Sequence, residues 1–148
     1  MRVDLRLSLA VLLLALAMPL KAQGLLNDYF LAVANDKVSD VRDYLKRGVD
    51  PDSVDANGDT GLITAARAGN AATVDVLLAA KADPQRRNRF GDTAMMVAAL
   101  NGHFGIMKAL RAKGAAVDGP GWTPLIYAAT GGHEDVVRWL LGEGADVN

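Results

Sequence analysis

Apolar residues occur in paired blocks along the chain after residue 57. Each pair opens with a Thr, runs through Ala-Ala to a Gly, and continues into a second block that contains a Leu. Short apolar blocks of this kind, separated by a glycine, predict two amphipathic helices joined by a tight turn. The predicted helices cover residues 60–68 and 72–80, 93–101 and 104–113, and 123–131 and 134–141.

The blocks repeat with a fixed period. Matching residues are 33 positions apart between units two and three, and 30 positions apart between units three and four. Each spacing is constant across a whole unit, so one deletion in one connector accounts for the difference. The deletion lies between Asp118 and Gly121, where Gly119-Pro120 replaces a longer loop. The matching residues are Thr60, Thr93 and Thr123, then Gly69, Gly102 and Gly132, then Leu77, Leu110 and Leu140.

Capping residues support these helices independently of the period. Thr123 before Pro124 is typical of a helix start, because the hydroxyl caps the first turn and proline needs no hydrogen bond there. Glycines that suit a left-handed backbone end the first helix of units two, three and four, and Gly114 and Gly144 end the second helix of units three and four. Lys81 stands where unit three has Gly114, so we expect strain or a different cap at that end.

Unit four carries the clearest motif, with Thr123-Pro124-Leu125 before Ala128-Ala129 and a Leu-Leu-Gly-Glu-Gly-Ala-Asp run from residue 140. This pattern and the 33-residue period resemble the ankyrin repeat family. The resemblance implies an all-α solenoid of stacked helix-turn-helix units with hairpin-like connecting loops. The units are expected at about 25–56, 57–89, 90–118 and 119–148, the first degenerate and the last incomplete. The family's usual His is replaced by Ile63, Met96 and Ile126, so apolar packing is expected in its place.

The resemblance also implies a function, because the family binds protein partners with its loop tips and the concave face of its first helices. The chain is therefore expected to be a protein-protein interaction module whose partner the sequence does not identify. Trp122, Tyr127 and Leu100 are expected to form an exposed anchor. An alternative is that Trp122 only folds over the shortened connector. The matching positions in this chain are Asp59, Asp92 and Trp122 at the loop tips, and Arg67, Leu100 and Tyr127 on the helices.

Charge differs sharply between neighbouring connectors. The connector after unit one is acidic between Asp50 and Asp59, whereas the next one contains Arg86, Arg87 and Arg89. Because the stack places these loops side by side, exposed ion pairs between them are one expectation, each worth about 0–1 kcal/mol. The other is a basic edge that binds an anion or a carboxylate.

The N-terminus has a different character. Arg2 and Arg6 precede an apolar run over residues 7–18, and Ala22 supplies a small residue before Gln23. This arrangement is typical of a secretory signal peptide over residues 1–22, with residues 23–148 as the exported domain. Ala17 is the second choice of cleavage site, and a retained anchor is the alternative, although the run is shorter than the roughly 20 residues that a membrane span needs.

Export to the periplasm or secretion is therefore expected, with no membrane attachment after cleavage. The chain has no Cys, so neither a disulfide nor a lipid-carrying cysteine is expected. Removal of residues 1–22 leaves a net charge of about −3. This balance gives no electrostatic reason to expect nucleic acid as a partner.

The sequence offers little catalytic chemistry. It contains two His residues and no Cys, so a nucleophile–histidine pair has few candidate members, and we expect no enzyme activity. His103 and His133 follow equivalent glycines and are expected to be structural, since two ligands alone make a poor zinc site. The acidic run over residues 50–59 lacks the Gly and the Glu of a calcium loop, so neither a metal nor another cofactor is expected.

The C-terminal end of the stack is expected to be open. No polar capping helix follows Val136, Val137, Leu140 and Leu141, although Trp139 is expected to cover part of this end. Truncation of a longer array is the preferred interpretation, and self-association through the open face is the alternative. The open end is also expected to make unit four the least stable part of the stack.

Overall fold

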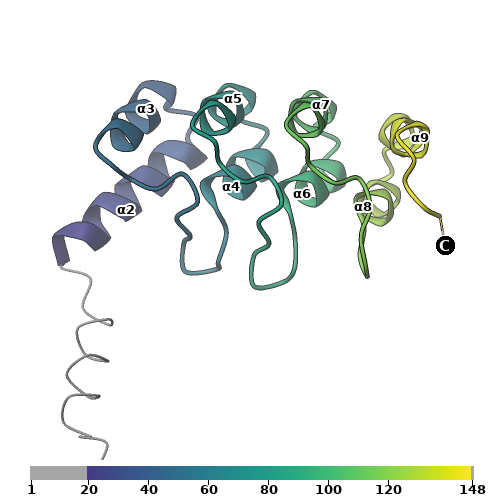
Figure 1. Ribbon diagram of the computed structural model, residues 1–148, viewed down its shortest axis with the longest axis horizontal. Coiled ribbons are helices and arrows are strands. Elements are labelled where there is room, and N and C mark those ends of the chain that lie inside the picture. Colours follow the sequence, from purple (N-terminus) through teal and green to yellow (C-terminus); the bar gives the residue numbers. More distant parts are fainter. Residues whose placement is uncertain (1–19, 148) are drawn as a thin grey trace, which may run out of the picture.

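The computed structural model describes residues 20–147, and these form a row of helix pairs (Figure 1). The expected signal peptide lies outside this part up to residue 19, and its expected cleavage site after Ala22 falls within the first described helix. The described helices are α2 (Leu20–Ala34), α3 (Val38–Lys46), α4 (Gly61–Ala68), α5 (Ala71–Ala79), α6 (Ala94–Leu100), α7 (Phe104–Ala112), α8 (Pro124–Gly131) and α9 (Glu134–Gly142).

The helices form two layers. The first helices of the four units, α2, α4, α6 and α8, lie in one layer, and the second helices, α3, α5, α7 and α9, lie in the other (Figure 1). Each first helix packs on the first helix of the next unit. The expected all-α stack of helix pairs is therefore confirmed.

Three connectors join the units and project beyond the layer of first helices (Figure 1). The first connector covers residues 47–60, the second 80–93 and the third 113–123. The amide of Asp55 donates to the carbonyl of Asp59 at 3.0 Å, and the amide of Asn88 donates to that of Asp92 at 3.0 Å. These bonds give the first two connectors the expected hairpin form.

Helix ends follow the capping residues. The hydroxyls of Thr60, Thr93 and Thr123 each accept a hydrogen bond from the backbone amide three residues later. Lys81 adopts a φ of 65°, which L-residues other than Asn and Asp rarely do, whereas the matching Gly114 has a φ of 90°. The expected strain at the end of α5 is therefore confirmed, at a cost of about 1–2 kcal/mol.

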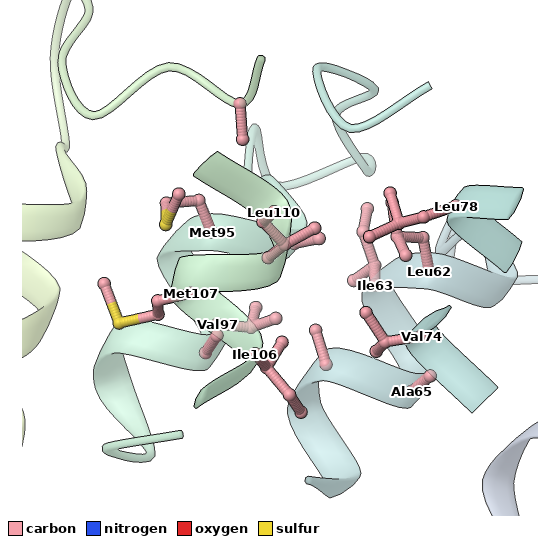
Figure 2. Close-up of a cluster of buried hydrophobic side chains, with 14 of the residues drawn as sticks. Leu62, Ile63, Ala65, Val74, Leu78, Met95, Val97, Ile106, Met107 and Leu110 are labelled. Atoms are coloured by element: carbon pink, nitrogen blue, oxygen red, sulfur yellow. The ribbon is translucent and has the colours of Figure 1, made fainter. Parts of the chain in front are cut away.

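The hydrophobic core runs between the two layers. Leu77, Leu110 and Leu140 are fully buried, and small alanines at the first helices allow neighbouring backbones to approach closely. Figure 2 shows Leu62, Ile63 and Val74 of unit two within the same cluster as residues of unit three. Because each unit covers its neighbour, the stack buries what a single helix pair leaves exposed.

Apolar packing replaces the family's histidine in only two of the three expected places. Ile63 and Met96 are buried, but Ile126 of unit four is 42% exposed. The expectation is wrong for Ile126, because the packing of α8 on α6 and α9 leaves much of this side chain in solvent.

Two histidines connect consecutive units. His133 Nε2 lies 3.0 Å from the carbonyl oxygen of Leu100, and His103 Nε2 lies 3.3 Å from that of Arg67. A Cβ at Gly69 would lie 2.8 Å from the His103 ring, so the glycine leaves room for the imidazole. The structural interpretation of both histidines is therefore confirmed.

The C-terminal face is less open than expected. Val136 and Leu140 are buried, while Leu141 is 44% exposed and Val137 is partly buried. Trp139 packs edge to face on Phe104, with ring centroids 5.4 Å apart. The tryptophan therefore covers part of the preceding unit, and the expectation that it covers the end of the stack is wrong.

The N-terminal unit meets unit two through a buried tyrosine. Tyr29 of α2 is fully buried and packs edge to face with Phe30 and Tyr44. Its hydroxyl lies against Gly61 at the start of α4.

Within residues 20–147, no helix has the length and apolar character required to cross a membrane.

Candidate partner-binding site

The second and third connectors enclose a recess with the adjoining helices α6 and α8. Its volume is about 490 Å³. Apolar and aromatic side chains form most of its walls, with polar groups at the sides. We call it the aromatic recess; it is lined by Arg87, Phe90, Gly91, Asp92, Leu100, Pro120, Trp122, Tyr127 and Thr130.

Two exposed aromatic rings from different connectors line the recess. Phe90 on the second connector is 78% exposed, and Trp122 on the third is 63% exposed. The Trp122 ring packs edge to face on Tyr127, with centroids 5.7 Å apart. Trp122 is thus held against α8 and remains accessible, as is Leu100 on α6. Exposed aromatics held in a defined orientation are the residues that most often dominate protein interfaces.

A hydrogen bond fixes the wall that carries Tyr127. Its hydroxyl donates to Asp92 Oδ1, and Asn88 Nδ2 donates to Asp92 Oδ2 at 3.4 Å. This hydrogen bond to the carboxylate, together with burial and the negative charge, raises the pKa of Tyr127 to about 12. Asp92 therefore joins unit three to unit four, and its carboxylate is engaged within the chain.

Asp59 occupies the equivalent position one unit earlier, but it is only 3% exposed. Arg67 forms an ion pair with its carboxylate, and Asn88 Nδ2 donates to Oδ1 at 2.7 Å. Burial alone would raise the pKa of Asp59, but the hydrogen bonds and the positive charge of Arg67 hold the pKa below its usual value. The expectation of an exposed Asp59 at a loop tip is wrong, because the carboxylate turns inward to these two partners.

The basic connector does not form the expected ion pairs. The ion pairs within residues 20–147 are Lys46–Asp43, Arg67–Asp59 and Arg111–Glu143, so they include none of the connector arginines Arg86, Arg87 and Arg89.

The acidic side chains of the first connector have other partners. Asp55 Oδ1 accepts from the amides of Asn57 and Asp59 at 2.8 and 2.9 Å, and Asp52 Oδ1 accepts from the amide of Asp83 at 2.8 Å. The connectors are neighbours as expected, but these carboxylates accept hydrogen bonds from backbone amides instead of pairing with arginines.

The structure divides the predicted contact residues into two groups. Arg67 and Arg89 do not line the recess: Arg67 is held by Asp59, and Arg89 packs over Gly58 of the first connector. Arg86 is exposed on the second connector outside the recess. The recess brings together Asp92, Trp122, Leu100, Tyr127 and Arg87.

Sequence reasoning missed Phe90 and Pro120. Each directly precedes the glycine that opens a unit, where unit two has Asn57. For Phe90, the sequence did contain a signal of exposure: an aromatic residue next to a tight turn. A large apolar side chain at such a position has little chance of burial.

Stacked helix pairs with projecting connectors define a repeat solenoid. The model for ankyrin repeats (three copies) matches residues 29–118 and again 73–148. The chain belongs to the ankyrin repeat family.

Its relatives share only this region. A transient receptor potential channel A1 homologue of Caenorhabditis elegans is 34% identical over 96 residues, which are 64% of this chain and 8% of that protein. The mouse ankyrin repeat and SAM domain-containing protein 6 is 39% identical over 64 residues, 40% of this chain and 7% of that protein. The human mitochondrial disaggregase is 43% identical over 60 residues, 40% of this chain and 8% of that protein. The chain thus spans less than a tenth of each relative.

Proposed function

We propose that this chain is an exported, non-catalytic module that binds a protein partner through the aromatic recess. The observation that carries the proposal is the pair of exposed rings, Phe90 and Trp122, in the lining of one recess of about 490 Å³. Repeat solenoids present such surfaces to partners without rearranging their core. Interfaces are dominated by a few aromatic anchors, so a recess with two of them suits partner binding.

The anchors and the surrounding wall have different roles. Trp122 and Phe90 offer apolar area to a partner, whereas Asp92 holds Tyr127 in place. We therefore expect Trp122→Ala and Tyr127→Ala each to weaken partner binding by about 1 kcal/mol or more without loss of the fold. Val147→Ala is a matched control, because Val147 is exposed but lies outside the recess. Binding that survives Trp122→Ala undiminished would contradict the proposed site.

Site-specific crosslinking identifies the partner and the surface together. A photoreactive phenylalanine analogue replaces Phe90 in one variant and Ala112, exposed on α7, in the control. We expect a crosslinked partner from the Phe90 position only, in an extract of the source cells. The same partner crosslinked equally from position 112 would contradict a site in the recess.

Export is the second part of the proposal. It rests on the basic start, the apolar run over residues 7–18 and the small residue Ala22. Cleavage after Ala22 would shorten α2 to residues 23–34 and leave Tyr29 in place. Export therefore does not conflict with the packing of unit one on unit two.

Self-association through the C-terminal face is a second candidate function. Leu141 is 44% exposed on that face, and Val137 lies beside it at a shallow hollow. If two copies meet there, light scattering should give a dimer mass, and Leu141→Asp should return the protein to a monomer. A monomer before the substitution would exclude this function at the concentrations tested.

A further inference from the structure

The aromatic recess lies beside a basic connector. Three positive charges stand on the second connector at Arg86, Arg87 and Arg89, and none belongs to an ion pair in the described part of the chain. The acidic group of the recess, Asp92, is engaged by the Tyr127 hydroxyl. Asp92 keeps its negative charge but is hydrogen-bonded to Tyr127 and Asn88, whereas Arg87, the other charged group of the recess lining, has no partner of opposite charge within residues 20–147.

Arg87 is the arginine that reaches the recess itself. Its Nη1 donates to the carbonyl oxygen of Gly91 at 2.6 Å, which orients the side chain along its own connector. A Cβ at Gly119 would lie 3.5 Å from Arg87 Nη2, so the guanidinium also lies close to the third connector. The guanidinium thus lies between the second and third connectors, in the lining of the recess.

A guanidinium has five N–H donors in a planar fork. The bond to Gly91 uses one of them, and the planar geometry of the rest matches a carboxylate, which Arg binds through two parallel hydrogen bonds. Behind this group, Phe90, Leu100 and Trp122 provide an apolar surface. The volume of about 490 Å³ lies within the range of pockets that enclose small ligands, so it accommodates at least one large side chain.

We propose that the recess binds a linear peptide segment in which a large apolar or aromatic side chain stands next to a carboxylate. The apolar side chain enters between Phe90 and Trp122, and the carboxylate pairs with Arg87. This inference rests on the proposed function and specifies the chemistry of the partner at the same site.

The shape of the recess favours a peptide over a lipid surface or a nucleic acid strand. Trp122 packs on Tyr127, and both line the hollow together with Leu100 of α6. A flat bilayer would reach only the connector tips. A side chain that protrudes from a peptide fits a hollow of this size.

Selection from a library of random linear peptides against the full chain tests the proposal. We expect selected peptides to carry Asp or Glu beside Trp, Phe, Tyr or Leu. Arg87→Gln and Trp122→Ala should each raise the Kd of a selected peptide about fivefold or more. Arg86→Gln is the matched control, since Arg86 is a neighbouring exposed arginine outside the recess, and it should change the Kd less than twofold at physiological salt.

A second comparison isolates the carboxylate. Replacing the peptide's Asp or Glu with the corresponding amide should weaken binding to the unaltered chain but not to the Arg87→Gln variant. The selected peptides could instead lack a carboxylate, with a Kd that rises in the Trp122→Ala variant and does not change in the Arg87→Gln variant. That result would overturn this inference and leave the proposed function standing. Peptides whose Kd does not change in the Trp122→Ala variant would overturn both this inference and the proposed function. Failure to select any peptide, or binding only to anionic phospholipid vesicles or a single-stranded oligonucleotide, would overturn the inference.

Discussion

Gly61 is the position where a small substitution should have the most informative effect on stability. It begins α4, where units three and four have Ala94 and Pro124. A Cβ at position 61 would lie 2.5 Å from Tyr29 Oη and 3.2 Å from Tyr29 Cζ. Tyr29 is fully buried, so it has little room to move. We therefore expect Gly61→Ala to destabilise the stack, although alanine is normally the better helix former.

The magnitude follows from two opposing effects. Overpacking a buried site costs about 1–3 kcal/mol, while replacing Gly with Ala in a helix gains at most about 1 kcal/mol. We expect a net loss of about 1–2 kcal/mol in the free energy of unfolding. The Tyr29→Phe background removes the closest atom, so Gly61→Ala should then be close to neutral. The coupling between the two sites should be about 1–2 kcal/mol.

Urea denaturation followed by circular dichroism measures all four members of this cycle. Gly105→Ala is the control, because Gly105 lies within α7 and a Cβ there would contact nothing within 4 Å. That substitution should stabilise the protein by up to about 1 kcal/mol. Equal destabilisation by Gly61→Ala with and without the Tyr29 hydroxyl would refute the explanation. Stabilisation equal to that of Gly105→Ala would show that Tyr29 is packed elsewhere.

Three further predictions concern other parts of the chain. Intact-mass analysis of the exported protein should find a chain that starts at Gln23, and retention of Met1 in a membrane pellet would contradict export. Hydrogen exchange should be faster at residues 136–141 than at residues 73–78, because unit two is covered on both sides; equal protection in a proven monomer would contradict this. The pKa of Tyr127 should be about 12, above its ordinary value of 10.0, so the stabilisation that it provides is complete below pH 10 and is lost as the pH rises through about 12. Asp92→Ala should lower that pKa in an ultraviolet titration, and an unchanged titration would exclude the hydrogen bond.

The local pattern was sufficient to predict the helices. Thr caps and the glycines after them place the starts and ends of α4 to α9 within one or two residues of the predicted ranges. The same register predicted the unusual backbone at Lys81, and the equivalent positions of His103 and His133 were expected to be structural. These features depend on residues within one unit or in adjacent units, so a repeat period is enough to identify them.

The direction of side chains at the connectors was not predictable in the same way. Asp59 and Asp92 share a repeat position, yet Asp59 turns to Arg67 while Asp92 holds Tyr127. The choice depends on which donor is available: Arg67 of the same unit for Asp59, and Tyr127 of the following unit for Asp92. The prediction of ion pairs between the acidic and basic connectors was wrong for a related reason: nearby backbone amides compete for carboxylates such as Asp55.

The shortened third connector has a consequence for how new binding sites can arise in this architecture. Helices keep their register across the three-residue difference between spacings of 33 and 30, so the loop absorbs all of it. Trp122 lies back against α8, whereas Phe90 stands out on the longer neighbouring loop. The aromatic recess thus lies where a long loop stands next to a short one. Insertion or deletion in a loop can open, close or move such a recess without changing a single core residue, which leaves recognition free to vary while the stack stays folded.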